Sequence, residues 1–281
     1  MLTILEIIKK TTDFFEKRGV ESARLNAELL VGHALGLKRM QLYIQFERPL
    51  SEVELDKIRP FVKRRGNREP LQHILGTMEF GGVTLKVDRR ALIPRPETEY
   101  LIELLVRRFP APPARVLDLG TGTGAIALAL AKAWPESVFM ATDRFDETLS
   151  LVRENADSNG LGTRVSFHCS DWFSALPSTE KYDLIVSNPP YLSDEETDAT
   201  APEVKDYEPR HALSAGNDGA AALKHIIREA VNWLNPGGHL ALETGVAQHA
   251  HLVSLLRTQG YASSESLKDL TGRDRFVLAA L

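Results

Sequence analysis

The pattern of hydrophobic and polar positions divides the chain into a helical N-terminal region and a longer region in which strands and helices alternate. Residues 1–75 repeat apolar side chains at the spacing of short helices. One such stripe contains Leu25, Leu29 and Leu30. It is expected to end near Gly36, because glycine commonly follows the last turn of a helix.

Two capping boxes mark the starts of helices in this region. Thr3 stands three residues before Glu6, and Ser51 stands three residues before Glu54. In such a box, the hydroxyl and the carboxylate each accept a hydrogen bond from a backbone amide that the first turn leaves free. We therefore expect helices to begin just after Thr3 and Ser51.

The spacing then changes to that of a strand. Val83, Leu85 and Val87 alternate with polar residues, which is typical of a half-buried strand. Two consecutive glycines, Gly81 and Gly82, precede them and indicate a tight turn. This segment is predicted to form a β-hairpin that connects two domains.

From Thr98 onward, helical and strand-like segments alternate. The helices are expected at residues 98–109, 125–133, 146–158, 219–234 and 247–259, and the strands at residues 115–119, 138–142, 164–168, 182–187, 239–244 and 275–280. Such alternation favours an α/β fold with a doubly wound, mostly parallel, Rossmann-like sheet. Because these sheets bind ligands at the carboxyl ends of their strands, the chemistry is expected just after residues 119, 143, 168 and 187.

We therefore predict three parts: a small helical domain at residues 1–75, a β-hairpin linker at residues 76–96 and an α/β domain at residues 97–281. Their charges differ. Residues 1–110 contain 20 Lys and Arg against 15 Asp and Glu, or +5, whereas residues 111–281 contain 14 against 23, or −9. The split indicates different electrostatic roles, although solvated surface charges can also scatter in this way.

The composition is that of a soluble globular protein and excludes several classes. Of the 281 residues, 43% are hydrophobic and 26% are charged, which excludes a disordered or collagen-like chain. The longest apolar stretch, residues 125–131, is far shorter than the ~20 residues of a membrane helix. The N-terminus lacks the unbroken apolar centre of a signal peptide, and the one cysteine, Cys169, permits no internal disulfide. We expect a cytoplasmic protein.

A glycine-rich loop follows the first strand of the α/β region. The segment from Val116 to Gly124 reads VLDLGTGTG and leads from a strand into a helix. Glycines let a ligand approach the backbone closely, and the helix N-terminus behind them favours a negative group. Asp143 comes 19 residues after Gly124, at the end of the next strand, where a carboxylate can accept hydrogen bonds from ribose hydroxyls. The alternative is a tight strand–helix turn that binds nothing.

The spacing of the loop favours S-adenosylmethionine over a dinucleotide. The glycines at 120, 122 and 124 form G-x-G-x-G, whereas the dinucleotide fingerprint is G-x-G-x-x-G. Asp118 stands two residues before the first glycine, and its carboxylate suits a ligand with an ammonium group better than a pyrophosphate. The residues expected to bind this cofactor are Asp118, Gly120, Thr121, Gly122, Thr123, Gly124 and Asp143.

Two further candidates for cofactor binding, Asp171 and Trp172, follow the third strand. The aspartate can accept a hydrogen bond from an adenine amino group, and the indole can pack on the face of the ring. Trp172 and its neighbour Phe173 could equally belong to the hydrophobic core or to a lid.

The segment Asn188-Pro189-Pro190-Tyr191 follows the predicted strand at residues 182–187. Its two prolines fix the backbone and remove two amide donors, so that the side-chain oxygen of Asn188 and the carbonyl of Pro189 remain as acceptors. Two converging acceptors can hold both hydrogens of a planar NH2 group, and Tyr191 can stack on its plane. The segment is therefore predicted to clamp an amide or an exocyclic amine, although a proline-rich loop can also simply end a strand.

Such a clamp suits transfer of a methyl group to nitrogen. An amide nitrogen is a poor nucleophile, because its lone pair is delocalised into the carbonyl. Acceptors for both of its hydrogens increase electron density on the nitrogen and stabilise the positive charge that develops on it. Holding the nitrogen in line with the methyl group adds proximity and orientation. No strong general base is needed, because the proton can leave after the transfer.

Together these motifs resemble the peptide chain release factor glutamine N5-methyltransferases, the HemK/PrmC family. The similarity rests on VLDLGTGTG, Asp143, DWF and SNPPY, and on LIPRPETE at residues 92–99 and YEPRHALSAGNDG at residues 207–219. It extends over essentially the whole chain, because the N-terminal helices and the hairpin also match the layout of the family.

The resemblance implies that the chain transfers a methyl group from S-adenosylmethionine to a glutamine side-chain amide in the Gly-Gly-Gln motif of class I release factors, in support of translation termination. The cofactor contacts that it implies are Gly120 to Gly124, Asp143, Trp172 and Asn188. The residues implied to hold the substrate glutamine are Asn188, Pro189, Pro190 and Tyr191, with Asn188, Pro189 and Tyr191 as the catalytic residues. We expect the N-terminal domain to recognise the substrate. We also expect a monomer without a metal, a membrane or a direct nucleic-acid partner.

Two other functions remain open from the residues alone. The same clamp suits adenine N6 or cytosine N4 of a nucleic acid. A flipped base requires a basic binding surface, however, and the α/β half of this chain is acidic. The other is a non-enzymatic, cofactor-binding assembly factor on the same fold, against which the intact NPPY segment argues.

Three further features have plain structural interpretations. His249 and His251 could chelate a metal on paper, but on a helix their side chains point apart. Cys169 is expected to be a packed small hydrophobe rather than a nucleophile. The basic run from Arg59 to Arg68 is expected to be a solvated face, with contact to an acidic partner as the alternative.

Overall fold

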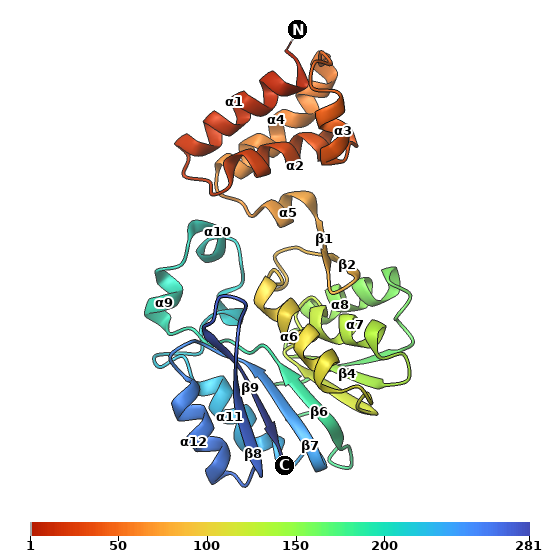
Figure 1. The fold of residues 1–281 in the computed structure, drawn as a ribbon, viewed down its shortest axis with the longest axis vertical. Coiled ribbons are helices and arrows are strands. Elements are labelled where there is room, and N and C mark those ends of the chain that lie inside the picture. The colour runs from red at the N-terminus through yellow and green to blue at the C-terminus, as the bar shows by residue number, and fades with distance from the viewer. Residues whose placement is uncertain (1) are drawn as a thin grey trace. The chain divides into compact units, whose positions relative to one another are not determined.

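The computed structural model describes residues 2–281, and the contacts within the chain divide it into two units (Figure 1). The first unit extends to Thr77 and includes the distant segment Ala201–Tyr207. The second unit comprises Met78–Thr200 and Glu208–Leu281. Nothing in the periodicity of the sequence indicated that the distant segment packs with the N-terminal helices.

The first unit is a bundle of short helices, as the sequence predicted. Its helices are α1 (Ile4–Lys17), α2 (Ala23–Leu35), α3 (Arg39–Ile44), α4 (Glu52–Gly66), α5 (Leu71–Leu75) and α10 (Pro202–Lys205). Both capping boxes are confirmed, with Thr3 and Glu6 at the start of α1 and Ser51 and Glu54 at the start of α4. None of the helices within residues 2–281 is long and apolar enough to cross a membrane.

The buried face of α2 differs from the predicted stripe. Leu30 is buried, but Leu25 is 40% exposed, so the prediction was wrong for Leu25. The helix buries Asn26 and Glu28 instead. Glu28 accepts a hydrogen bond of 2.8 Å from Arg39. A buried carboxylate that is held by arginine occupies part of this face, and a hydrophobic pattern does not reveal such a pair.

The basic run from Arg59 to Arg68, in α4 and just after it, is only partly a solvated face. Arg59 and Lys63 are exposed. Arg65 is buried and donates to Glu203 of α10 at 2.9 Å, and Arg68 donates to the same carboxylate at 2.6 Å. The prediction of a solvated face is therefore wrong for Arg65 and Arg68, whose acidic partner lies in the same chain, 138 and 135 residues away respectively.

The second unit is built on a seven-stranded sheet in the order β5-β4-β3-β6-β7-β9-β8. The strands are β3 (Arg115–Leu119), β4 (Val138–Asp143), β5 (Val165–Cys169), β6 (Tyr182–Ser187), β7 (Leu234–Glu243), β8 (Ser263–Lys268) and β9 (Asp274–Ala280). The pairs from β5 through β7 are parallel, whereas β9 is antiparallel to β7 and to β8. The predicted doubly wound, mostly parallel α/β fold is confirmed.

Helices cover both faces of this sheet (Figure 1). On one face lie α6 (Pro96–Arg108), α7 (Ala125–Ala133) and α8 (Asp146–Ser158), and on the other lie α11 (Ala221–Ala230) and α12 (His249–Thr258). Alternate residues of β3 serve the two cores, since Val116 packs with the first three helices and Leu117 with the other two. Because β4, β3 and β6 are parallel neighbours, their carboxyl ends lie at the same edge of the sheet.

The hairpin of β1 (Thr77–Phe80) and β2 (Val83–Lys86) packs on helices of the second unit. Its predicted alternation is confirmed, because Val83 and Leu85 are buried. The backbone amide of Lys86 donates to the side chain of Asn155 in α8 at 2.7 Å. The hairpin, which the sequence predicted as part of a linker, thus contributes to the core of the second unit.

The main differences from the predicted elements lie in the last third of the chain. The edge strand β8 was not predicted, because most of its side chains are exposed and the strand lacks apolar alternation. β7 begins at Leu234 rather than at residue 239. Two short elements, α9 (Asp194–Asp198) and the 3-10 helix η1 (Arg210–Ala212), follow the NPPY segment. Their few apolar residues produce no hydrophobic period.

Candidate active site

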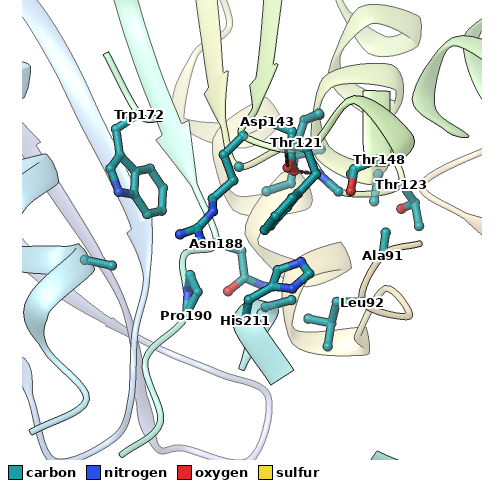
Figure 2. Close-up of a pocket in the computed structure, with 18 of the residues that line it drawn as sticks. Ala91, Leu92, Thr121, Thr123, Asp143, Thr148, Trp172, Asn188, Pro190 and His211 are labelled. Atoms are coloured by element: carbon teal, nitrogen blue, oxygen red, sulfur yellow. Dashed lines mark hydrogen bonds between the residues drawn. The ribbon is translucent and has the colours of Figure 1, made fainter. Parts of the chain in front are cut away.

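A cavity of about 380 Å³ lies in the second unit, at the carboxyl ends of β3, β4 and β6 (Figure 2). The predicted site residues that line it are Gly120, Thr121, Gly122, Thr123, Asp143, Asp171, Trp172, Asn188 and Pro190. The predicted site residues outside its lining are Asp118, Gly124, Pro189 and Tyr191. The expectation that the strand ends converge on one site is confirmed.

The last glycine of the loop serves packing. Gly124 has a φ of 85°, a region that favours glycine. A Cβ at this position would overlap Cγ2 of Val152 in α8 and would lie 3.0 Å from Cδ1 of Leu128 in α7. Gly124 therefore permits the close approach of α7 and α8, and its contact with a cofactor stays a prediction.

Asp143 ends β4 and lies in the wall of the cavity. Its Oδ2 accepts a hydrogen bond of 3.2 Å from the amide of Gly122, and its Oδ1 accepts one of 3.2 Å from the amide of Phe145. Burial raises the pKa of Asp143, and these backbone hydrogen bonds oppose the rise. Each carboxylate oxygen has a further lone pair, so Asp143 can still accept hydrogen bonds from a ligand.

Asp118 is fully buried in β3, beneath the glycine loop. Its Oδ2 accepts hydrogen bonds from the hydroxyl of Thr121 at 2.6 Å and from the amide of Ala127 at 3.2 Å. Its Oδ1 has no hydrogen-bond partner among residues 2–281. Burial raises the pKa of Asp118 to about 7, the two hydrogen bonds oppose the rise, and the charge of Asp143 adds to it. The unpartnered oxygen is compatible with one more donor.

Trp172 forms part of the cavity wall (Figure 2). Its φ of 51° is unusual for a bulky side chain, and such strain tends to occur at functional sites. The indole lies against Gly120, where an added Cβ would meet it at 3.5 Å. The neighbouring Phe173 is buried and stacks on Trp233 at 5.6 Å between centroids. Phe173 therefore belongs to the core, whereas Trp172 lines the cavity and also packs against that core.

Asn188 directly follows β6, and its side chain reaches the cavity (Figure 2). Its Nδ2 donates to the hydroxyl of Thr98 at 3.0 Å. Thr98 lies in the first turn of α6 and donates in turn to Glu243, at the end of β7, at 2.7 Å. The amide oxygen of Asn188 is thus the end of the group that remains available to a ligand.

Tyr191 is anchored outside the cavity, whereas Pro190 lines it. The hydroxyl of Tyr191 donates to Glu243 at 3.2 Å, and its carbonyl accepts from Nε2 of Gln248 at 3.0 Å. Burial raises the pKa of Tyr191, and the negative charge of Glu243 raises it further. The stacking of Tyr191 on a substrate stays a prediction.

Comparisons with known proteins follow the same division of the chain. A model described as the PrmC N-terminal domain matches residues 6–76, and a methyltransferase domain matches residues 112–271. The release factor glutamine methyltransferase of Geobacter sulfurreducens is 40% identical over 98% of this chain and 95% of its own. That of Deinococcus radiodurans is 41% identical over 99% of this chain and 98% of its own. The chain belongs to the release factor glutamine methyltransferase family. The resemblance noted in the sequence is therefore confirmed, and the chain is a methyltransferase.

The fold of this release factor glutamine methyltransferase family member recurs in more distant enzymes. A methyltransferase from Pyrococcus furiosus matches with a TM-score of 0.53 at 18% identity, over 71% of this chain and 89% of that chain. A 16S rRNA methyltransferase from T. Thermophilus matches with a TM-score of 0.52 at 20% identity, over 73% of this chain and 49% of that chain. At such identities the likeness concerns the fold alone.

Two aromatic rings that no sequence motif indicated lie in the cavity of this family member. Phe145 and His211 both line it, with 4.0 Å between their ring centroids. Burial lowers the pKa of His211, and the charge of Asp143 opposes this shift. His211 lies in η1, within the YEPRHALSAGNDG segment. Because this segment has no hydrophobic period, its resemblance to the family was the only available signal.

An ion pair between Arg95 and the buried Glu208 joins the LIPRPETE segment at residues 92–99 to the YEPRHALSAGNDG segment at residues 207–219. The carboxylate of Glu208 accepts hydrogen bonds from the backbone amide of Ile93 at 3.0 Å and from Arg95 at 2.6 Å. Arg95 also lines the cavity. The residue before α6 and the segment that carries His211 are thus held against the same cavity.

The structure corrects one expectation about side chains outside the site and refines another. Cys169 is exposed rather than packed, and its thiol donates to the carbonyl of Arg144 at 3.6 Å. The two ring nitrogens of His249 lie 2.7 Å from the hydroxyl of Thr244 and 2.8 Å from that of Ser266. Both nitrogens are therefore engaged in hydrogen bonds within the protein.

Proposed function

We propose that the chain methylates the side-chain amide nitrogen of the glutamine in the Gly-Gly-Gln motif of class I peptide chain release factors. The observation that carries this proposal is the position of Asn188. Its amide lies in the same cavity as Asp143 and the glycine loop, with its nitrogen held by Thr98 and its oxygen available to a substrate. A cofactor site and an acceptor for an NH2 group therefore share one cavity.

The residues of this cavity fit S-adenosylmethionine as the methyl donor. Its volume of about 380 Å³ is in the range of small-molecule sites. Asp143 offers acceptors for ribose hydroxyls in the cavity wall. Asp118 lies buried beneath this lining, and its unpartnered Oδ1 is compatible with an ammonium group. Trp172 presents an indole to the cavity, against which an adenine can pack. The residues proposed to hold the cofactor are Asp118, Gly120, Thr121, Gly122, Thr123, Gly124, Asp143, Asp171, Trp172 and Asn188.

When bound, S-adenosylmethionine supplies an electrophilic methyl group on a sulfonium centre. The task of the protein is to hold the acceptor nitrogen and to stabilise its developing positive charge. The side-chain oxygen of Asn188 and the carbonyl of Pro189 accept hydrogen bonds from the two hydrogens of the substrate amide. These bonds strengthen as charge develops, which favours the transition state over the ground state. Pro190 and Tyr191 complete the substrate site.

The family relationship favours glutamine over a nucleic-acid base or a non-enzymatic role. Relatives that match over nearly their whole length are release factor glutamine methyltransferases. Residues 111–281, which contain the cavity lining from Gly120 onward, carry a net charge of −9, whereas nucleic-acid sites are usually basic. An exocyclic amine of a base is therefore the less favoured substrate of the same clamp.

We further propose that the N-terminal unit selects the release factor. A cavity that accepts a glutamine side chain cannot distinguish one glutamine from the many others in the cell. Selection must come from contacts remote from the reacting nitrogen, and their binding energy can also help to position the amide. Exposed basic residues such as Lys57 and Lys63 suit an acidic partner, whose association would weaken with salt. We expect the enzyme to act in the cytoplasm, as a monomer.

Mass spectrometry of a purified, unmethylated release factor tests the main proposal. After incubation with the enzyme and S-adenosylmethionine, we expect one added methyl group on the Gly-Gly-Gln glutamine. Asn188→Ala is expected to lower turnover by ~100–1,000-fold, because it removes a preorganised contact to the reacting nitrogen. Asn232→Ala, at an exposed position, is the matched control and should retain turnover. Methylation of a different residue by the wild-type enzyme, or full turnover by Asn188→Ala, would contradict the proposal.

A further inference from the structure

A buried carboxylate lies behind the NPPY segment. Glu243 ends β7 and is 0% exposed. Its Oε2 accepts a hydrogen bond of 2.7 Å from the hydroxyl of Thr98, and its Oε1 accepts one of 3.2 Å from the hydroxyl of Tyr191. Two segments far apart in the sequence, the first turn of α6 and the NPPY segment, therefore meet on one carboxylate. Burying a charge is costly unless hydrogen bonds compensate for it, and the hydroxyls of Thr98 and Tyr191 supply such bonds here.

The charge on Glu243 fixes the donor and the acceptor in each hydrogen bond that links it through Thr98 to Asn188. An ionised carboxylate can only accept, so the single hydrogen of the Thr98 hydroxyl is committed to Glu243. The Thr98 oxygen then offers only a lone pair to its other neighbour. That neighbour is Nδ2 of Asn188, which donates at 3.0 Å. The charge on Glu243 thereby decides which end of the Asn188 amide faces Thr98.

We propose that Glu243 is a positioning residue, which acts through Thr98 to keep the amide oxygen of Asn188 toward the substrate. The inference rests on the proposed methylation of glutamine. A reversed Asn188 would present an NH2 group to the NH2 group of the substrate, and two donors cannot bond to each other. The network thus maintains the acceptor that the reaction needs, although neither Thr98 nor Glu243 has to touch the reacting nitrogen.

The same hydrogen bonds predict that the orientation of the Asn188 amide depends on pH. Burial raises the pKa of Glu243 to about 7, and the groups around it modify this value. The hydrogen bond from Thr98, the positive charge of Arg275 and the hydroxyl of Tyr191 lower the pKa, and the charge of Glu97 raises it. When protonated, Glu243 can donate to Thr98, whose hydroxyl is then free to donate to the oxygen of Asn188. The reversed orientation of Asn188 therefore gains population as the pH falls through about 7.

Two substitutions of Thr98 separate this role from simple packing. Thr98→Val keeps the volume but removes the hydroxyl, whereas Thr98→Ser keeps the hydroxyl. With a glutamine-containing substrate, we expect Thr98→Val to lower kcat by about 10–100-fold, as loss of a supporting contact does in other sites, with little change in KM. Thr98→Ser should recover most of this loss. Thr197→Val is the control, because Thr197 is also buried but its hydroxyl donates to the backbone carbonyl of Ser193, the residue that caps its own helix α9.

The pH profile of kcat supplies the second measurement. In the wild-type enzyme, kcat should fall on the acid side with a midpoint near the pKa of Glu243, about 7. In Glu243→Gln this acid limb should disappear, because glutamine does not titrate. Asp118 titrates in the same range, so Asp118→Asn is measured beside Glu243→Gln at saturating S-adenosylmethionine. A Thr98→Val enzyme with wild-type kcat, or an acid limb that is as large in Glu243→Gln as in the wild-type enzyme, would overturn the positioning role while leaving the proposed function intact. Absence of glutamine methylation by the wild-type enzyme would instead overturn the proposed function, and this role with it.

Discussion

The Oδ2 atom of Asp143 accepts a hydrogen bond of 3.2 Å from the backbone amide of Gly122. This bond joins the end of β4 to the loop that follows β3, so a single carboxylate both shapes the glycine loop and faces the cavity. A side chain with both tasks is difficult to replace. Its loss should alter the geometry of the loop as well as remove an acceptor for the ligand.

Asp143→Ala should weaken the binding of S-adenosylmethionine at least tenfold. Hydrogen bonds to a charged acceptor contribute ~1.5–3 kcal/mol each, and ~1.4 kcal/mol corresponds to a factor of ten in affinity. Isothermal titration calorimetry measures the dissociation constant directly. Asp146→Asn, an exposed carboxylate in the first turn of α8, is the control and should bind normally. An unchanged dissociation constant for Asp143→Ala would exclude Asp143 as the ribose partner.

Gly124→Ala should destabilise the protein more than Gly160→Ala. Both glycines have a positive φ, 85° and 69°, so both substitutions introduce backbone strain of ~1–2 kcal/mol. At Gly124 the new Cβ also overlaps Val152, which adds an overpacking cost of ~1–3 kcal/mol, whereas nothing lies within 4 Å of a Cβ at Gly160. Urea unfolding of the two variants measures the difference. Equal losses would show that α7 and α8 can shift to accommodate the methyl group.

The sequence was sufficient to predict the fold wherever burial follows a regular period. The parallel strands β3 and β6 and the helix α7 begin and end at the predicted residues, because their apolar side chains reflect burial in the core. The edge strand β8 and the segment of α10 were missed because neither has a buried apolar face. β8 is mostly exposed, and α10 is held to the first unit by the ionic contacts of Glu203 rather than by an apolar face.

In the candidate site, too, the sequence predicted some residues and not others. Motifs at strand ends, such as the glycine loop and Asn188, were predicted because they combine a rule of topology with unusual residue types. His211 enters the cavity from an irregular segment, and Glu243 acts through Thr98, a residue in another element. A linear sequence shows neither the approach of a loop nor the direction of a buried hydrogen bond.

The pH dependence of stability should reveal the buried charge of Asp118. Its pKa in the folded protein is about 7, raised mainly by burial, whereas an unfolded aspartate titrates near ~3.9. Between these values the folded state holds a proton that the unfolded state releases, so the free energy of unfolding falls as the pH rises from about 4 to about 7.

Asp118→Asn removes this titration. The free energy of unfolding of this variant should therefore fall less steeply between about pH 4 and about pH 7 than that of the wild-type protein. Asp171→Asn, at an exposed carboxylate, is the control and should leave the slope unchanged. The measurement is urea unfolding of the ligand-free protein at several pH values. Identical slopes for Asp118→Asn and the wild-type protein would show that Asp118 ionises in the folded state at its ordinary pKa.

Glu203→Gln should destabilise the first unit far more than Glu52→Gln. Glu203 is 17% exposed and binds Arg65, whose side chain is 7% exposed, so neutralising Glu203 leaves a buried guanidinium without its counterion. Breaking a buried pair costs ~3–5 kcal/mol, and the partial exposure of Glu203 places the expected loss toward the lower end of this range. The pair of Glu52 and Arg59 is 76% and 60% exposed, and such surface pairs contribute only ~0–1 kcal/mol.

Urea unfolding measures the loss of stability in both variants, Glu203→Gln and Glu52→Gln. Digestion with trypsin reports on the segment Ala201–Tyr207 itself, since release of α10 should speed cleavage after Lys205. Equal stability of the two variants, with no change in the rate of that cleavage, would show that contacts other than the ion pair hold Ala201–Tyr207 to the N-terminal helices.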